Sequence, residues 1–114
     1  MGARYAVDPL ALIGAARASL FRMAENCLDT PRMGHALDLD VVRLDLDEAI
    51  DIMAPCPLRE AVGRVRAELG ALDVHDRALS LDDLGSIYHL AELRLARVEL
   101  ALIETGHAGL EKAA

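Results

Sequence analysis

The stretch that decides the fold runs from Ser80 to Thr105 and reads SLDDLGSIYHLAELRLARVELALIET. Ser80 can cap a helix, with Asp83 as the acidic partner of a capping box. Gly106 follows at the usual place for a helix stop. The pattern predicts a long C-terminal helix over 80–105, about 39 Å in length at about 1.5 Å per residue. One face carries apolar residues three and four positions apart, as in a packed helix: Leu84, Tyr88, Ala91, Leu95, Val98 and Leu102.

A second apolar set lies on nearly the opposite side of this helix when successive residues are placed about 100° apart. It consists of Leu90, Leu93 and Leu100. A helix on the surface of a monomer needs only one apolar stripe. The two-sided pattern therefore predicts a helix that is either central in its bundle or shared with another chain. We expect these leucines, with Arg97 among them, to form a homodimer interface.

The first helix is predicted over residues 8–28. Asp8 can serve as its N-cap and Pro9 as its first residue, where the missing N–H costs nothing. Apolar residues then recur at intervals of three and four. Pro31 forces the preceding residue out of the helical region and ends the pattern. Residues 31–35 are expected to form a loop.

Two further helices are predicted over residues 38–53 and 57–72. Residues 37–44 begin with an alternation of apolar and acidic side chains, which taken alone is typical of a strand. The alternation slips at Val42, and a helical pattern continues beyond it. A lone strand would have no pairing partner, so we favour a helix. Gly63 in the third helix costs about 1 kcal/mol relative to alanine; it either permits close helix approach or has no role.

These patterns together predict an all-α protein, a four-helix antiparallel bundle whose long C-terminal helix dimerises. The 114 residues are enough for one domain with its own core. Hydrophobic residues make up 54% of the chain and aromatics only 3%, and such an aliphatic core suits helices better than a sheet. Residues 1–7 and 106–114 are expected to be a flexible lead-in and tail.

Charge and composition exclude several classes of partner. The net charge of −7 works against anionic partners, and the chain has neither the basic stripe nor the stacking aromatics of a nucleic-acid-binding protein. No apolar run approaches the roughly 20 residues that span a bilayer, and the N-terminus has no signal pattern. We expect a cytoplasmic protein that binds neither nucleic acid nor membrane, with two free thiols. The preference for Arg over Lys suggests a bacterial coding bias.

Cys56 is the most chemically suggestive residue, because it would sit at the N-cap of the helix over 57–72. Backbone N–H groups and the helix dipole favour a thiolate there. Such a thiolate could serve as a redox sensor or as a metal or haem ligand. The alternative is an ordinary cysteine in a Pro-Cys-Pro turn. Cys27, on the apolar face of the first helix, is expected to be a small buried hydrophobe.

His89 and Glu92 are a candidate metal-binding pair, because residues three apart are neighbours on one side of a helix. The alternative is a histidine that is partly exposed or lies at an interface. Glu104 and His107 have the Glu-x-x-His spacing of di-iron bundles. That motif needs to occur twice on continuous helices, whereas here it occurs once and includes the expected stop at Gly106.

Three acidic residues, Asp40, Asp47 and Asp51, are expected to share one face of the second helix. Such a face either binds a cation or a basic partner, or is simply solvated, and it lacks the loop of an EF-hand. His35 and His75 are expected to be solvated polar residues.

Motifs of familiar enzymes are missing from the sequence: it has no Walker loop, dinucleotide-binding glycine motif, Cys-x-x-Cys or nucleophile elbow. We therefore predict a non-enzymatic interaction module, a regulator, adaptor or accessory subunit without a cofactor. It is expected to form a homodimer and to bind a protein partner of basic character. The alternative is a bundle that senses a ligand, a metal or redox state through Cys56 or through His89 and Glu92. A helical enzyme with scattered acidic and histidine residues is the third possibility.

Overall fold

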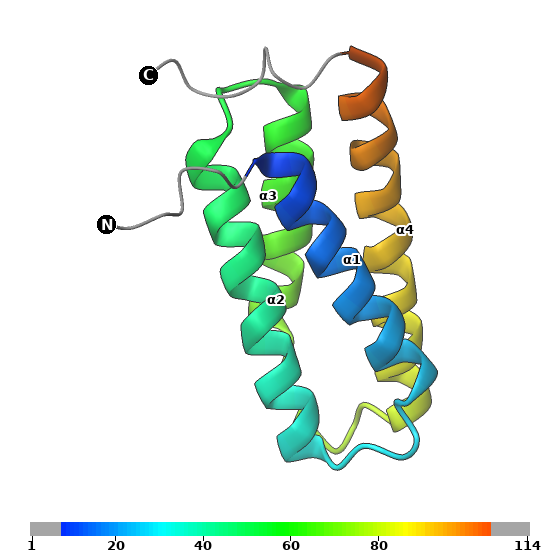
Figure 1. Ribbon diagram of the computed structural model, residues 1–114. Coiled ribbons are helices and arrows are strands. Elements are labelled where there is room, and N and C mark those ends of the chain that lie inside the picture. Colours follow the sequence, from blue (N-terminus) through cyan, green and yellow to red (C-terminus); the bar gives the residue numbers. More distant parts are fainter. Residues whose placement is uncertain (1–7, 106–114) are drawn as a thin grey trace, which may run out of the picture.

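The computed structural model describes residues 8–105, which form four helices joined by turns and loops (Figure 1). The predicted all-α class is confirmed. The expected lead-in and tail, with the helix stop at Gly106, lie outside the described residues. The helices are α1 (Pro9–Glu25), α2 (Arg32–Ile52), α3 (Pro57–Ala71) and α4 (Leu81–Thr105).

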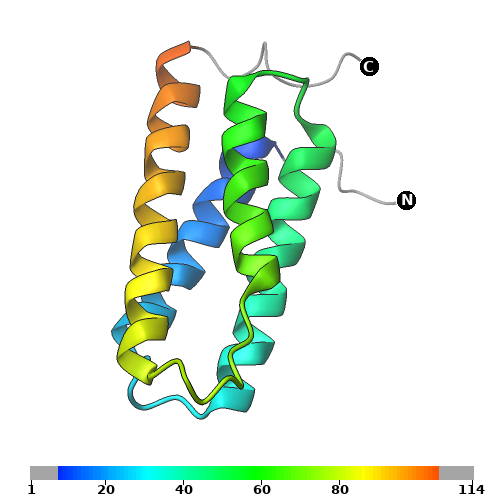
Figure 2. The same ribbon diagram turned by 180° about the vertical axis from the view of Figure 1, so that it is seen from behind.

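The helices form a ring in which α1 packs against α2 and α4, and α3 packs against the same two helices. The α1–α2 and α3–α4 connections lie at one end of the molecule, and the α2–α3 connection lies at the other (Figures 1 and 2). Because α2 and α4 occupy diagonal corners of this ring, their outer faces point in different directions.

The helix starts follow the capping chemistry that the sequence predicts. Asp8 Oδ1 accepts a hydrogen bond from the backbone N–H of Ala11 at 2.8 Å. At the start of α4, Ser80 Oγ accepts from the Asp83 N–H at 3.0 Å, and Asp83 Oδ2 accepts from the Ser80 N–H at 2.9 Å. These are the two reciprocal bonds of a capping box. They satisfy N–H groups that have no partner within the helix.

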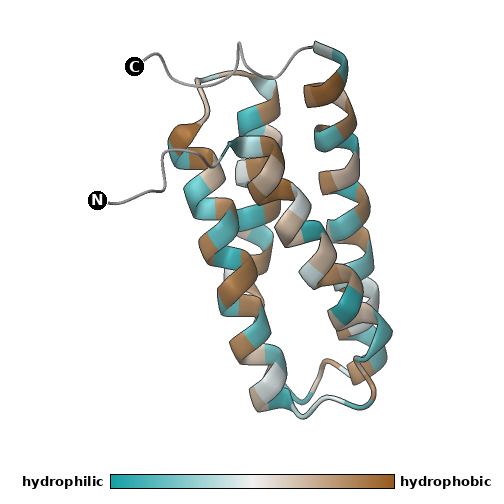
Figure 3. Ribbon diagram, viewed as in Figure 1, coloured by the Kyte–Doolittle hydropathy of each residue, from teal (hydrophilic) through white to brown (hydrophobic). Residues whose placement is uncertain are grey.

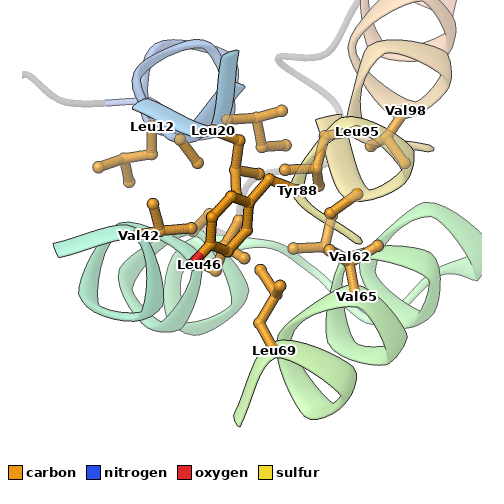
Figure 4. Close-up of a cluster of buried hydrophobic side chains, with 14 of the residues drawn as sticks. Leu12, Leu20, Val42, Leu46, Val62, Val65, Leu69, Tyr88, Leu95 and Val98 are labelled. Carbon is orange, nitrogen blue, oxygen red and sulfur yellow. The ribbon is translucent and has the colours of Figure 1, made fainter. Parts of the chain in front are cut away.

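A single aliphatic core lies between the four helices and contains the whole predicted apolar face of α4. In Figure 4 the ring of Tyr88 lies among side chains that come from all four helices. Tyr88 is the only aromatic member of this core within residues 8–105. Among the side chains drawn there are Leu12 and Leu20 of α1, Val42 and Leu46 of α2, Val62 and Leu69 of α3, and Leu95 of α4.

The predicted start of the second helix is wrong, because α2 begins at Arg32 and includes most of the expected loop over 31–35. Pro31 is the N-cap residue, with extended dihedral angles of φ −67° and ψ 156°. The residue before a proline is barred from the helix, but the proline itself can precede a helix that begins directly after it. His35, which we expected to be solvated, lies in the second turn of α2 and is completely buried.

The alternation over residues 37–44 has a helical explanation. Leu39 and Val42 point into the core, whereas Leu37, Val41 and Leu44 lie on the opposite side of α2 and are exposed. Two apolar stripes on one helix place apolar residues close together in sequence, so that they resemble the period of a strand. In Figure 3 apolar residues recur along α2 between polar ones.

The other boundaries lie within three residues of the predicted ones, and the start of α3 and the end of α4 coincide with them. Helix α1 ends at Glu25 instead of residue 28, and the N–H of Asn26 still bonds to the Arg22 carbonyl at the C-cap. The chain then turns, and the N–H of Asp29 donates to the Asn26 carbonyl. Gly63 lies in open space, since a Cβ built there would meet nothing within 4 Å. Close helix approach at Gly63, one of the two predicted roles, is therefore not observed.

Candidate functional site

The outer face of α4 is open to solvent and apolar. Leu90, Leu93 and Leu100, which were predicted to form an interface, have exposed fractions between 47% and 57%. Arg97 lies exposed among them, and Ile103, which the prediction missed, is 58% exposed. Helix α4 is not central in the bundle, because it packs against α1 and α3 only along its inner side. That alternative is wrong, and the second stripe faces solvent.

A second exposed apolar stripe, which the sequence analysis missed, runs along α2. It consists of Met33, Leu37, Val41 and Leu44, with exposed fractions between 53% and 67%. Their spacings of 4, 4 and 3 place them on one face of the helix. The signal was present in the sequence. It was hidden because the first of these residues was assigned to a loop and the others to a segment of ambiguous period.

Carboxylates border the α2 stripe on both sides. The directions of successive side chains on a helix differ by about 100° around its axis. Asp38 and Asp45, which directly follow Leu37 and Leu44 in the sequence, therefore lie together on one side of the stripe. Asp40 and Asp47 lie on the other side. Helix α2 carries six carboxylates against two arginines, a net charge of −4 out of −7 for the whole chain.

Both arginines of α2 are directed away from the stripe, toward backbone carbonyl groups of other segments. Arg32 donates to the carbonyls of Val74 at 2.8 Å and Leu79 at 2.7 Å, in the α3–α4 connection. Arg43 donates to the carbonyl of Leu69 at 2.6 Å, near the end of α3. Each guanidinium thus satisfies carbonyls at or beyond a helix C-terminus, where a cation also interacts favourably with the helix dipole. Arg43 also pairs with Asp40 at one border of the stripe, whereas neither arginine of α2 pairs with Asp38 or Asp45 at the other.

Of the predicted acidic face, Asp40 and Asp47 form ion pairs. Asp40 accepts from Arg43 on its own helix, and Asp47 binds the guanidinium of Arg66 on α3 at 2.7 and 3.1 Å. Both carboxylates are exposed. Asp51 is exposed too, and no ion pair involving it is found within residues 8–105. The three residues do not converge on a common point, but they leave this part of the α2 surface negative.

The predicted pairing of His89 with Glu92 is wrong. Glu92 is buried against α1, where Arg17 donates to its Oε2 from Nε at 2.9 Å and from Nη2 at 2.6 Å. Arg17 also binds Glu99, two turns further along α4 than Glu92. The hydrogen bond to Glu92 raises the pKa of Arg17, which stays charged. His89 points outward and is exposed. Glu92 pairs with Arg17 of α1 and not with His89 of its own helix, because a buried carboxylate needs a partner of opposite charge.

This ion-pair cluster forms the floor of a shallow groove of about 410 Å³ between α1 and α4. Phe21 on the rim is half exposed, and Gly14 allows the close approach of Glu99, since a Cβ there would lie 3.3 Å from its Oε2. The carboxylates in the groove already bind Arg17. The cluster therefore joins α1 to α4 and is a structural contact between them.

A buried polar network connects α2, α4 and the end of α1. His35 Nε2 lies 3.1 Å from the carbonyl oxygen of Cys27, and Tyr88 Oη lies 3.1 Å from His35 Nδ1. A carbonyl oxygen can only accept, so Nε2 carries the proton and Nδ1 accepts from the tyrosine hydroxyl. Both rings are completely buried, and their centroids are 5.6 Å apart. Burial raises the pKa of Tyr88 to about 12, with a smaller contribution from Asp38.

The two cysteines are free, as expected. Cys56 is the N-cap of α3, as predicted, and its Sγ accepts from the N–H of Arg59 at 3.4 Å. Cys27 is buried and touches the place where a Cβ on Gly85 would lie, at 2.6 Å from Sγ. Gly85 thus lets α4 pack closely on the end of α1. The cysteines belong to connections at opposite ends of the molecule (Figure 1), too far apart to be bridged.

The remaining candidates give no assembled site. Within residues 8–105, no group of three or more His, Cys, Asp or Glu side chains is placed to hold a metal ion. Glu104 is exposed at the end of α4, and its predicted companion His107 lies outside the described residues. His75 is exposed in the α3–α4 connection, as expected. None of the described helices has both the length and the apolar composition needed to cross a membrane.

Comparison of the chain with protein-family models, with curated proteins and with solved structures finds no match.

Proposed function

We propose that this chain is a small cytoplasmic interaction module, a regulator, adaptor or accessory subunit that acts through protein–protein contacts without catalysing a reaction. The observation that carries the proposal is the placement of exposed apolar side chains. Within residues 8–105, eight of the ten large exposed hydrophobic residues lie on the outer faces of α2 and α4. Apolar side chains scattered singly need no explanation, whereas contiguous stripes mark interaction sites.

We further propose an antiparallel bundle that forms a homodimer through α4. The alternate placement of the connections in Figure 1 supports the antiparallel arrangement. The α4 stripe is symmetric about the point between Ala96 and Arg97. Leu93 and Leu100 are equally far from that point, and so are Leu90 and Ile103. Two copies of α4 packed in opposite directions therefore bring Leu93 of one copy opposite Leu100 of the other.

Such symmetry is what a two-fold interface requires, because residue i contacts residue j and j contacts i. This pairing brings one like-charged contact to the axis, between the two Arg97 side chains, and places Glu104 of one copy opposite His89 of the other. The acidic face of α2 would instead place like charges opposite one another in a two-fold pair, which is destabilising. Self-association is therefore assigned to α4 and not to α2.

Sedimentation velocity on two matched double variants tests this assignment. Leu93→Ser with Leu100→Ser removes two exposed leucines from α4, and Leu37→Ser with Leu44→Ser removes two from α2. We expect the unaltered protein and the α2 variant to sediment as dimers at tens of micromolar, and the α4 variant as a monomer. An unaltered protein that remains monomeric, or a dimer lost in the α2 variant, would contradict the proposal. Circular dichroism checks that both variants stay folded.

The alternative, a bundle that senses a metal, a ligand or redox state, has less support. Glu92 already binds Arg17, so it does not form a site with His89. Cys56 Sγ already caps α3. This alternative predicts metal or haem that co-purifies with the protein and is lost in Cys56→Ser or His89→Ala. Elemental analysis and a visible spectrum after addition of metal and haem decide between the two.

A further inference from the structure

We propose that the outer face of α2 binds a basic amphipathic helix of a partner protein. The docking surface consists of the stripe Met33, Leu37, Val41 and Leu44 together with the carboxylates that border it. This inference deepens the proposed function by naming the chemistry of the partner. It is separable from dimerisation, because α2 and α4 occupy diagonal corners of the bundle.

The apolar part of the surface has the form that a helical ligand requires. Met33, Leu37 and Val41 lie four residues apart, and Leu44 continues the row. The row is nearly parallel to the axis of α2 and extends over about 16 Å at about 1.5 Å per residue. A partner helix can cover it with residues at positions i, i+3 or i+4, and i+7. The core of the bundle already has its own side chains from α2, so binding requires no rearrangement of the fold.

The charges around the stripe select the sign of the partner. Asp38 and Asp45 border one side, and Asp40 and Asp47 border the other. Asp40 already pairs with Arg43 and Asp47 with Arg66, whereas no ion pair of Asp38 or Asp45 is found within residues 8–105. A helix with lysines or arginines beside its apolar row would meet Asp38 and Asp45 on one side, and on the other side carboxylates that each share an arginine of this chain. Complementary potentials of this kind increase the rate of association and determine the register.

The same charges argue against the other occupants of such a surface. A second copy of α2 would bring its own carboxylates against these. Nucleic acids and anionic lipid surfaces carry the same sign as the border and are repelled. An acidic helix is disfavoured for the same reason, although its apolar row would fit. The surface therefore discriminates by repulsion as well as by attraction.

Two synthetic peptides of about 18 residues, long enough to form an isolated helix in part, test the proposal. Both carry the same leucine row; one has lysines on its borders and the other has glutamates. Binding to the full chain is measured by isothermal titration calorimetry at low and at raised salt. We expect the basic peptide to bind, with affinity that falls as salt rises, and the acidic peptide not to bind.

Three variants of the full chain separate the apolar contribution from the charge. Leu37→Ser with Leu44→Ser should weaken binding of the basic peptide by roughly thirtyfold, because two leucines that the bound peptide would cover are lost. Asp38→Asn with Asp45→Asn should weaken it by roughly threefold to tenfold and reduce its salt dependence. Leu93→Ser with Leu100→Ser on α4 should leave it unchanged.

Several results would overturn the inference. If both peptides bind equally, the charge border has no role. If the basic peptide binds the Leu37→Ser, Leu44→Ser variant as tightly as the unaltered protein, it is held by charge alone and the stripe is not the docking surface. If the α4 variant loses peptide binding, the peptide occupies the α4 face. Sedimentation velocity measures dimerisation independently of peptide binding. Absence of peptide binding therefore leaves the homodimer proposal intact, and absence of a dimer leaves the α2 docking surface intact.

Discussion

The buried hydroxyl of Tyr88 predicts a loss of stability at alkaline pH that is specific to this residue. Burial raises its pKa to about 12 from 10.0 in a model compound. Below pH 10 the hydroxyl is protonated in both the native and the unfolded chain. Between pH 10 and about 12 the unfolded chain loses this proton first, so stability falls as the pH rises. Two pKa units at about 1.4 kcal/mol each correspond to about 2.7 kcal/mol.

Tyr88→Phe isolates this effect from every other group that titrates in the same range. The variant should already be about 1–3 kcal/mol less stable at neutral pH, because His35 Nδ1 loses its buried hydrogen-bond donor. Urea unfolding followed by circular dichroism gives the free energy of unfolding of both proteins from neutral pH to about pH 12. The difference between them should be constant below pH 10 and then decrease by up to about 2.7 kcal/mol. A difference that stays constant across the whole range would show that the Tyr88 hydroxyl has the same pKa in the native and the unfolded chain.

Three further predictions concern packing, ion pairs and capping. Gly63→Ala should raise the free energy of unfolding by about 0.5–1 kcal/mol, because the new methyl group enters open space in a helix, whereas Gly85→Ala should lower it by about 1–3 kcal/mol through collision with Cys27 Sγ. Equal effects of the two variants in urea unfolding would disprove the close packing of α1 on α4. Arg17→Ala should cost about 3–5 kcal/mol because it leaves Glu92 buried without a partner. Arg66→Ala removes only the solvent-accessible pair with Asp47 and should cost at most about 1 kcal/mol. If thermal unfolding shows Arg66→Ala to be more destabilising than Arg17→Ala, Glu92 does not depend on Arg17 as described. Cys56→Ser should keep α3 as stable as before, since a hydroxyl is a better cap than a thiol, and Cys56→Ala should cost about 1 kcal/mol in the same measurement.

Features that depend on residues close in sequence were predictable. The caps formed by Asp8, Cys56 and Ser80 depend on residues within three positions of each other, and all three are present. The inner face of α4 followed from its spacing alone and is buried as predicted. The exposed leucines on the outer face of α4 were also found from spacing.

Features that depend on contacts between distant segments could not be derived in this way. The burial of His35 requires Tyr88, 53 residues further along the chain, and the burial of Glu92 requires Arg17, 75 residues away. Local spacing therefore assigned His35 to a solvated loop and paired Glu92 with His89. Met33, the first residue of the α2 stripe, was missed for a local reason, because Pro31 was interpreted as the start of a loop instead of a helix cap.

Native mass spectrometry of the unaltered full chain, purified from its own host, beside the Leu93→Ser, Leu100→Ser variant tests both the homodimer and the absence of a bound ligand. A homodimer formed through α4 gives a species of twice the chain mass for the unaltered protein, without additional mass, and a monomer for the variant. A monomer for the unaltered protein would contradict the homodimer. A retained mass that chelation or denaturation removes would contradict the interaction module and favour the sensing alternative.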